Sequence, residues 1–310
     1  MNKIVYVLGE LNVDLIMTGD DVAPEWNREK LVNSFDMALG SSSAITACGL
    51  AGLGLDVRMV SVVGGDEIGA FCIERLKEKG VSVEHVVALE AEKTGVTLSL
   101  STMRDRALLT YMGTISMLRP EHLPERMFEE ADHIHFGSYF LQESMRPHWF
   151  ALFRRAKERG ITTSFDTGWD PGERWYKDEI SQLLAVTDYF VPSEDEIMNI
   201  FGGASLYETL DAVPAYPGRI AVKCGARGAV LAGPGKERIV VGPFPVEPID
   251  TTGAGDSFNA GFIYASLAGR EGKEALRFAC ACGALATTRI GGASGVPSLQ
   301  DVEAMLRSSN

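Results

Sequence analysis

Short apolar runs alternate with amphipathic stretches along most of the chain. The runs are typical of buried strands, and the stretches between them repeat apolar residues with helical spacing. Strands are predicted at residues 4–9, 57–64, 134–137, 162–166, 189–192 and 219–225. Helices are predicted at residues 42–53, 68–79, 145–159, 178–186 and 194–201. Because strand–helix–strand units build parallel sheets, this order predicts an α/β fold with a doubly wound, mostly parallel sheet flanked by helices.

One segment breaks this alternation. Residues 94–102 and 107–113 alternate polar and apolar positions around a turn at 103–106, which predicts an antiparallel hairpin. Residues 31–39 are expected to pair with this hairpin and to complete a small β-sheet lid. A β-meander at 229–241 and helices at 254–267, 273–289 and 299–306 are predicted to follow.

No repeat and no long linker divides the chain. We therefore expect a single domain over residues 1–310, with the lid formed by roughly 12–40 and 93–114. Exposed strands of a small sheet invite edge pairing unless they are covered. We therefore expect a homodimer in which the lids of two copies cover each other.

The chain is acidic, because 29 Lys and Arg residues face 42 Asp and Glu residues, for a formal net charge of −13. Such a surface repels nucleic acid and anionic membranes, and we expect neither as a partner. Any bound anion needs a local device, such as a helix N-terminus or a metal ion. The five cysteines lack CxxC spacing and are interpreted as free thiols, which favours a cytoplasmic location.

The most specific feature is the stretch DTTGAGDSFNAG at residues 250–261, which opens a helix rich in small residues. Gly253, Ala254 and Gly255 carry almost no side chain, so their N–H groups can converge at the helix N-terminus as an anion hole. A carboxylate at Asp256 suits a general base that takes a proton from a hydroxyl attacking a phosphate. The alternative is a Gly-rich helix start with an ordinary acidic N-cap.

This stretch resembles the C-terminal signature of the PfkB, or ribokinase-like, family of carbohydrate kinases. Other blocks resemble the family in order and distance over most of the chain: GELNVD at 9–14, VGGDEIG at 63–69, SFDTGWDP at 164–171, VPSEDE at 191–196 and VKCGARGA at 222–229. The resemblance implies a ribokinase-like fold and transfer of the γ-phosphate of ATP to a primary hydroxyl. It makes Asp256 the catalytic base, with the three preceding N–H groups stabilising the transferred group.

The resemblance also implies where the acceptor binds. Asn12 and Asp14 match the family's substrate-binding pair, and their spacing on an extended stretch turns both side chains to one face. A turn-forming pair after a strand is the alternative. The family's GGxxxN block falls on Gly40, Ser41 and Ile45, which assigns Gly40 and Ser41 to the acceptor site. Ile45 replaces the family's Asn and cannot hydrogen-bond a hydroxyl, so the identity of the sugar stays open.

The nucleotide site is assigned in the same way to Lys223, Gly225, Gly228 and Thr252. The two glycines are interpreted as turn residues that allow close approach of ATP. Lys223 replaces a more usual Thr, and it either reaches a phosphate or is solvated. A phosphate on an acidic protein needs neutralising, so Mg²⁺ is expected as a cofactor beside ATP.

Two further positions are candidates for metal ions, and one for the acceptor. Glu196 matches the Glu of the family's NxxE motif, with Ser193 in place of the Asn, and would support Mg²⁺ through water. The same spacing fits a helix-capping box, and one Glu can serve both roles. Asp250 resembles the family's monovalent-cation loop, which implies activation by K⁺. Arg106, like Arg104 at the hairpin tip, either solvates the turn or contacts an anionic group of the acceptor.

Other signatures of phosphate-binding and hydrolytic enzymes are absent from the sequence: a GxxxxGK[ST] loop, an HRD loop, a GxGxxG after the first strand and a GxSxG elbow. The expected function is an ATP-dependent sugar kinase, a phosphotransferase that acts on a hydroxyl of a sugar or keto-sugar acid. A nucleoside kinase of the same family and a catalytically silent regulatory relative remain as alternatives. Altered positions such as Ser41, Ile45 and Ser193 keep the silent relative open.

Overall fold

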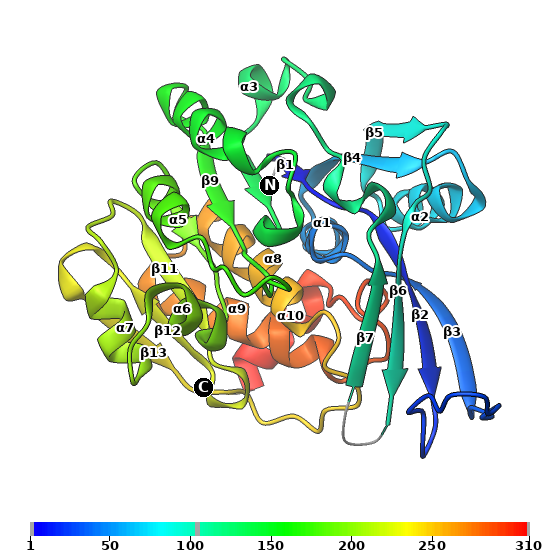
Figure 1. The fold of residues 1–310 in the computed structure, drawn as a ribbon. Coiled ribbons are helices and arrows are strands. Elements are labelled where there is room, and N and C mark those ends of the chain that lie inside the picture. The colour runs from blue at the N-terminus through cyan, green and yellow to red at the C-terminus, as the bar shows by residue number, and fades with distance from the viewer. Residues whose placement is uncertain (1–2, 103–105, 309–310) are drawn as a thin grey trace.

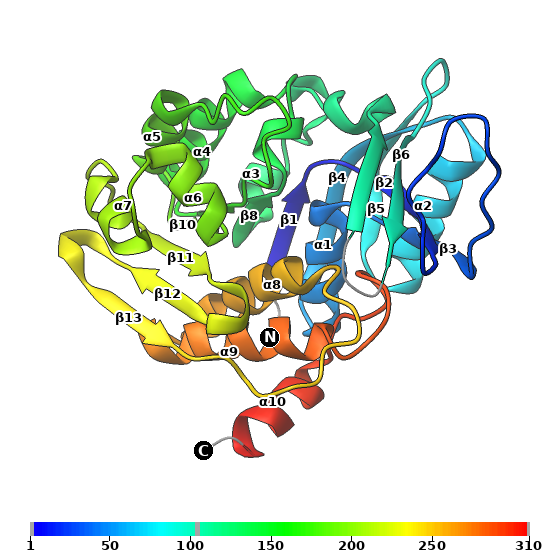
Figure 2. The same ribbon diagram turned by 60° about the horizontal axis from the view of Figure 1, so that its bottom comes forward.

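The computed structural model describes residues 3–102 and 106–308. A nine-stranded sheet runs through the molecule in the order β13-β12-β11-β10-β9-β8-β1-β4-β5, and helices cover both of its faces (Figure 1, Figure 2). Its strands are β1 (Ile4–Leu8), β4 (Asp56–Gly64), β5 (Ser82–Leu89), β8 (His133–Phe136), β9 (Thr162–Phe165), β10 (Tyr189–Phe190), β11 (Arg219–Lys223), β12 (Ala229–Ala232) and β13 (Arg238–Val241). Neighbours from β5 to β11 pair in parallel, and β12 pairs in antiparallel fashion with both β11 and β13. The expected doubly wound, mostly parallel sheet is confirmed.

The sequence pattern does not predict the edge strand β5. Its residues are half-buried or exposed in an irregular order, so neither a continuous apolar run nor a clean alternation marks it. The other strands of this sheet and the predicted helices lie within a few residues of their expected positions, whereas the short helices at Met127–Glu130 and Leu206–Ala212 are not predicted. Strand and helix ends are the least predictable part of such a pattern.

The helices form two layers around separate apolar cores. One layer consists of α1 (Ser42–Gly52), α2 (Glu67–Glu78), α8 (Ala254–Leu267), α9 (Gly272–Ala286) and α10 (Leu299–Ser308). The other consists of α3 (Met127–Glu130), α4 (Trp149–Glu158), α5 (Lys177–Leu184), α6 (Glu194–Phe201) and α7 (Leu206–Ala212). Short 3₁₀ helices lie at Gly113–Ser116, Pro120–His122, Tyr139–Leu141, Arg146–His148, Gly225–Arg227 and Pro234–Lys236. None of the helices in the described ranges is long and apolar enough to cross a bilayer.

Successive side chains of β1 point alternately into the two apolar cores. Val5 and Val7 point into the α1–α8–α9 layer, whereas Tyr6 and Leu8 point into the other. Side chains buried on both faces explain why this strand is a continuous apolar run.

Small residues let α8 lie deep between its neighbours. A Cβ at Gly49 of α1 would come within 2.7 Å of Ala260 of α8, and one at Gly261 would come within 2.7 Å of Cys282 of α9. These glycines therefore set the distance between the three helices. The small-residue pattern after residue 253 thus fixes where the N-terminus of α8 lies.

A second, four-stranded sheet stands beside the first in the order β3-β2-β6-β7. Its strands are β2 (Asn12–Thr18), β3 (Ser34–Leu39), β6 (Gly95–Ser101) and β7 (Arg106–Tyr111). The predicted hairpin β6–β7 is present. The expected pairing of β3 with that hairpin is wrong, because β2 pairs in parallel with β6 and in antiparallel fashion with β3, and so lies between them.

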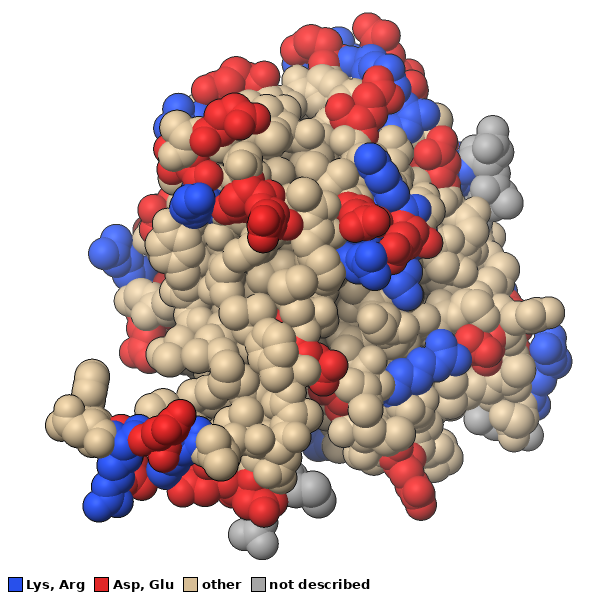
Figure 3. Space-filling view, turned by 90° about the vertical axis from the view of Figure 1, so that its right-hand side faces the viewer, with Lys and Arg blue, Asp and Glu red and all other residues tan. Residues whose placement is uncertain are grey.

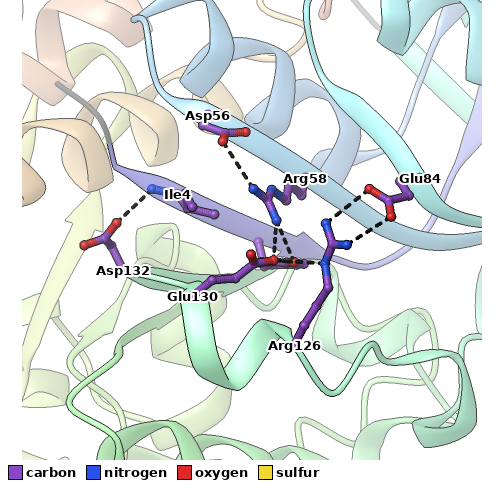
Figure 4. Close-up of polar contacts among 8 residues, drawn as sticks. Ile4, Asp56, Arg58, Glu84, Arg126, Glu130 and Asp132 are labelled. Atoms are coloured by element: carbon purple, nitrogen blue, oxygen red, sulfur yellow. Dashed lines mark hydrogen bonds and ion pairs between the residues drawn. The ribbon is translucent and has the colours of Figure 1, made fainter.

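A network of charged side chains joins α3 to the amino-terminal ends of the strands (Figure 4). Glu130 accepts hydrogen bonds from Tyr6 of β1 and Arg58 of β4. Arg126 donates to both carboxylate oxygens of Glu84 on β5, at 3.1 and 3.2 Å, and to Glu130 at 3.1 Å. Single exposed ion pairs contribute little, so the network matters as a connection between several elements. It lies at the opposite edge of the sheet from the carboxyl ends of the strands.

Two buried histidines share a chain of hydroxyl groups between β8 and β9. His133 bonds Thr162 at 2.8 Å and Ser164 at 2.7 Å, and His135 bonds the same Ser164 at 2.8 Å. Complete burial lowers the pKa of His133 to about 3 and that of His135 to about 4. Both imidazoles are therefore neutral in the folded protein at neutral pH.

These histidines predict a loss of stability in mild acid. Their pKa values are lower in the folded than in the unfolded chain, so protonation of the unfolded chain favours unfolding as the pH falls below about 6.5. Between pH 7 and pH 5, each histidine should lower the free energy of unfolding by about 2 kcal/mol. Urea unfolding of His133→Gln at both pH values should show a smaller loss than the parent protein. An equal loss in both would contradict this explanation.

Candidate active site

A cavity of about 1250 Å³ lies at the carboxyl ends of the central strands. The small sheet, the first turns of α1 and α8, and the loops at 248–252 and 290–294 line it. Strand β1 has β4 on one side and β8 on the other, so the direction of the chain connections reverses here. Ligands of open α/β sheets bind in the crevice at such a reversal.

The residues of the predicted anion hole lie at the start of α8. Gly253 is the N-cap residue with φ of 75°, and a Cβ there would come within 2.8 Å of Gly292. The N–H of Ala254 bonds back to the Thr251 carbonyl at 3.3 Å. The N–H groups of Gly253 and Gly255 have no acceptor within the described part of the chain. Two of the three expected donors are thus open to a ligand, and the third is weakly engaged.

Asp256 lies in the first turn of α8 and lines the cavity. Ser42 Oγ donates to its Oδ1 at 2.6 Å, and Oδ2 accepts no hydrogen bond from the described residues. Burial raises the pKa of the Asp256 carboxyl to about 7. The negative charges of Asp166 and Glu10 add to this rise, whereas the Ser42 hydrogen bond and the Lys223 ammonium oppose it. A carboxyl with a pKa near neutrality is suited to taking up and releasing a proton.

The two predicted acceptor residues lie on β2 and face the cavity together. Asn12 Nδ2 donates to Asp14 Oδ1 at 3.3 Å and lies 3.5 Å from Thr97 Oγ1 on β6. A Cβ at Gly40 would come within 2.3 Å of Asp14 Oδ1, so only glycine leaves room for the carboxylate. Carboxylate, amide and hydroxyl groups on one face can bind several sugar hydroxyls.

The other residues of the predicted acceptor block have structural contacts. Ser41 is the N-cap residue of α1; its hydroxyl accepts from Ala44 N at 3.0 Å and donates to the Glu10 carbonyl at 2.6 Å. Ile45 packs against the loop beside α8, since a Cβ at Gly292 would lie 2.5 Å from its Cδ1. Arg104 lies outside the described residues, and Arg106 is described only by the backbone that begins β7.

Lys223 is buried at the end of β11 rather than solvated. Its ammonium forms an ion pair with Asp166, and it donates to Asn259 Oδ1 of α8 at 3.3 Å. Asn259 Nδ2 in turn donates to Asp166 Oδ2 at 2.8 Å. Burial disfavours the charge of Lys223, but attraction to Asp166 and Glu196 outweighs this effect and raises its pKa. Lys223 Nζ lies 3.6 Å from where a Cβ of Gly255 would be, next to the anion hole.

Glu196 forms the capping box that its spacing predicts. Its Oε2 accepts from Ser193 N at 2.8 Å, and its own N–H donates to Ser193 Oγ at 3.3 Å. Thr167 Oγ1 lies 3.4 Å from the same Oε2. Burial and the charge of Asp166 raise the pKa of Glu196. Oε1 accepts no hydrogen bond from the residues described, so it is available to water.

Asp250 connects two loops at the edge of the cavity. Its carboxylate accepts from Thr252 N and from Gly291 N, each at 2.9 Å.

The two predicted glycines of the nucleotide site follow Lys223 in the chain. Gly225 and Gly228 have φ of 55° and 88° in the turn between β11 and β12. Both conformations favour glycine, in agreement with their interpretation as turn residues.

The structure brings the predicted base and acceptor residues together on one cavity: Asn12, Asp14, Ser41, Asp250, Thr252, Gly253 and Asp256. The other predicted residues that the structure describes in full are outside the cavity lining: Gly40, Glu196, Lys223, Gly225, Gly228, Ala254 and Gly255. Lys223 still acts electrostatically on Asp256. Sequence reasoning missed the roles of Glu10, Ser42, Asp166 and Asn259, although each lies within or beside a motif quoted above. Their contacts join segments far apart in the chain, which no spacing rule reveals.

Comparison with known proteins agrees with this geometry. The model of the pfkB family of carbohydrate kinases matches residues 2–299. An ATP-dependent ribose-1-phosphate kinase of Halopiger xanaduensis is 34% identical over 301 residues, which cover 96% of each chain. A 2-dehydro-3-deoxygluconokinase of Bacillus subtilis is 27% identical over 96% of each chain.

A solved structure extends the agreement to the whole fold. The crystal structure of a putative ribokinase II from E. coli in complex with ATP and Mg²⁺ has a TM-score of 0.84 at 25% identity, and the alignment covers 99% of this chain and 100% of that one. The family match spans nearly the entire sequence, and Asn12, Asp14 and Asp256 from its first and last motifs line one cavity. The chain therefore belongs to the pfkB family of carbohydrate kinases and is an ATP-dependent sugar kinase.

Proposed function

We propose that the chain transfers the γ-phosphate of ATP to the primary hydroxyl of a small sugar held between Asn12, Asp14 and Asp256. One observation carries the proposal. Asp256 lines the cavity at the N-terminus of α8; Ser42 holds one carboxylate oxygen, and the other has no hydrogen-bond partner among the described residues. Asn12 and Asp14 line the same cavity.

Each of the residues around the cavity has a separate role in the proposed phosphoryl transfer. The acceptor O–H bond breaks and its proton passes to Asp256, while the acceptor oxygen forms a bond to the γ-phosphorus and the bond from phosphorus to ADP breaks. The N–H groups of Gly253 and Gly255 stabilise charge on the transferred group, with the α8 dipole behind them. Lys223 supplies a fixed positive charge beside them. Positioning and electrostatic stabilisation account for most of the catalysis of phosphoryl transfer.

The first acceptor to test is a pentose 1-phosphate. This choice rests on the relative from Halopiger xanaduensis, which is 34% identical and named a ribose-1-phosphate kinase. Arg106 at the start of β7 is our candidate for an anionic group of such an acceptor. A keto-sugar acid is the second class, on the basis of the relative from Bacillus subtilis.

An acceptor screen tests this proposal. ADP release with Mg-ATP is measured across pentoses, pentose 1-phosphates, hexoses, keto-sugar acids and nucleosides, with acceptor-free ATP hydrolysis subtracted. Turnover should appear with a sugar or sugar derivative and be greatest with a pentose 1-phosphate. Greater turnover with nucleosides would replace the proposed acceptor class, and bound ATP without any turnover would support a silent relative.

We also propose Mg²⁺ and K⁺ as cofactors. The described residues contain no cluster of three or more His, Cys, Asp or Glu side chains placed to hold a metal. The arrangement fits a Mg²⁺ ion that takes ligands mainly from ATP and water, with Glu196 Oε1 as a partner through water. When bound, Mg²⁺ would neutralise phosphate charge. Asp250 and the nearby carbonyl groups are the candidate K⁺ site.

The small sheet is proposed to act as a lid and as a dimer contact. Its inner face is mostly polar, although Ile16 and Leu108 also line the cavity. Phe35, Leu109 and Tyr111 alternate with the cavity-facing residues and have 56–60% of their surface exposed. This side of the molecule also has a broad area without charged side chains (Figure 3). A second copy of the chain would cover these apolar residues. Solution scattering should show a dimer, and a monomer at working concentration would exclude it.

A reducing, cytoplasmic environment is proposed from the cysteines. All five are free thiols, and Cys48, Cys72, Cys280 and Cys282 are buried. Burial raises the pKa of Cys48 and of Cys72 to about 12, so these thiols are unreactive.

A further inference from the structure

The first turn of α1 holds the proposed base in place. Ser42 Oγ donates to Asp256 Oδ1 at 2.6 Å, and Thr46 Oγ1 lies 3.4 Å from the Asp256 carbonyl oxygen. The hydroxyl of Ser42 therefore restrains the Asp256 carboxylate through Oδ1. Oδ2 has no hydrogen-bond partner among the described residues, and Asp256 lines the cavity.

A buried carboxylate underlies this turn. Glu10 is only 3% exposed, and its carboxylate accepts from Ser43 Oγ at 2.8 Å, Ser138 Oγ at 2.9 Å and Gln142 Nε2 at 3.0 Å. Ser41 Oγ, which donates to the Glu10 carbonyl at 2.6 Å, lies 3.1 Å from the same carboxylate. Within the described part of the chain, no Lys, Arg or His forms an ion pair with it. Burying a carboxylate without a cation is costly, even with several hydrogen bonds. Such a group requires an explanation beyond stability.

The position of this carboxylate suggests one. Glu10 bonds the serines on both sides of Ser42, so it fixes the backbone from which Ser42 reaches Asp256. Glu10 also lines the cavity and places a negative charge near Asp256.

We infer that Ser42 and Glu10 are positioning residues of the phosphoryl transfer. Ser42 orients Asp256 so that Oδ2 faces the acceptor hydroxyl, and Glu10 fixes the serine run and maintains a negative field at the base. This inference rests on the proposed role of Asp256. Neither residue needs to touch the acceptor or ATP, because both act through Asp256.

Removing Ser42 and removing Glu10 should shift the pKa of Asp256 in opposite directions. The charged groups that act on Asp256 are Asp166, Lys223 and Glu10, and the first turn of α1 carries no acidic or basic side chain. The Ser42 hydrogen bond stabilises the ionised carboxylate, so its loss raises the pKa. The charge of Glu10 destabilises the ionised form, so its loss lowers the pKa.

The test is the pH dependence of kcat/KM for three variants. The parent rate should rise with pH through a limb near pH 7, because the base acts when ionised. Ser42→Ala should shift this limb to higher pH by about one unit and lower kcat about tenfold. Glu10→Gln should shift the limb to lower pH by about half a unit. Ser42→Thr keeps the hydroxyl, so it should show the same pH limb as the parent and most of the parent rate.

The controls separate this inference from the proposed function. Urea unfolding of each variant shows whether a change in rate comes from lost folding. If Asp256→Asn is inactive but Ser42→Ala and Glu10→Gln keep the parent limb, the positioning roles are wrong and the base stands. If Asp256→Asn retains full activity, the proposed function itself is wrong. Shifts of both limbs in the same direction would also overturn the inference.

Discussion

Asp256→Asn should lower kcat by about a thousandfold, and leave the fold and the affinity for ATP intact. General-base catalysis contributes about 10²–10⁴ to enzymatic rates, and an amide cannot take up the acceptor proton. Asn keeps the size of the side chain, and its carbonyl oxygen can still accept the Ser42 hydrogen bond. The loss should therefore fall on the chemical step rather than on binding.

The measurement is ADP release under saturating acceptor and Mg-ATP, together with calorimetric titration of ATP into both proteins. Asp178→Asn, an exposed change in the first turn of α5, is the matched control and should behave like the parent. Retention of more than a tenth of the parent rate by Asp256→Asn would rule out Asp256 as the base.

Lys223→Met should have the second largest effect, because it affects both stability and catalysis. Removing the ammonium leaves the Asp166 carboxylate buried without its cation. Breaking a buried ion pair in this way costs about 3 kcal/mol or more in the free energy of unfolding. The change also removes the positive charge beside the anion hole, and we expect kcat to fall at least about a hundredfold.

A double variant separates these two effects. In Asp166→Asn/Lys223→Met both charges are absent, so most of the lost stability should return, whereas kcat should stay low. Urea unfolding midpoints and ADP release are measured for the parent, both single variants and the double variant. Recovery of kcat together with stability would show that Lys223 acts only through the fold.

The sequence was informative where local pattern decides the structure. The alternation of apolar runs and amphipathic stretches follows the layers of an α/β sheet, and the hairpin β6–β7 follows its polar and apolar alternation. Small residues around 253–261 predict the N-terminus of α8, and in the structure they also allow its close packing. The Ser193–Glu196 spacing predicts the capping box that the structure contains.

Tertiary contacts account for what the sequence could not predict. Ser42 and Asp256 are 214 positions apart, and Lys223 and Asp166 are 57 apart. A serine in a run of three is compatible with capping, solvation or catalysis until α1 and α8 are placed side by side. Whether Lys223 is solvated or buried depends on Asp166 at the end of another strand. The pairing of β3 with β2 instead of the hairpin has the same origin, since several edges were compatible with its pattern.

The most direct test of the account is a crystal structure of the protein with its acceptor and a non-hydrolysable ATP analogue. If Asp256 is the base, its Oδ2 lies within about 2.6–3.2 Å of the acceptor's primary hydroxyl. The γ-phosphate is then expected at the N–H groups of Gly253 and Gly255. A carboxyl turned toward bulk solvent, with the acceptor hydroxyl beyond hydrogen-bonding distance, would contradict it.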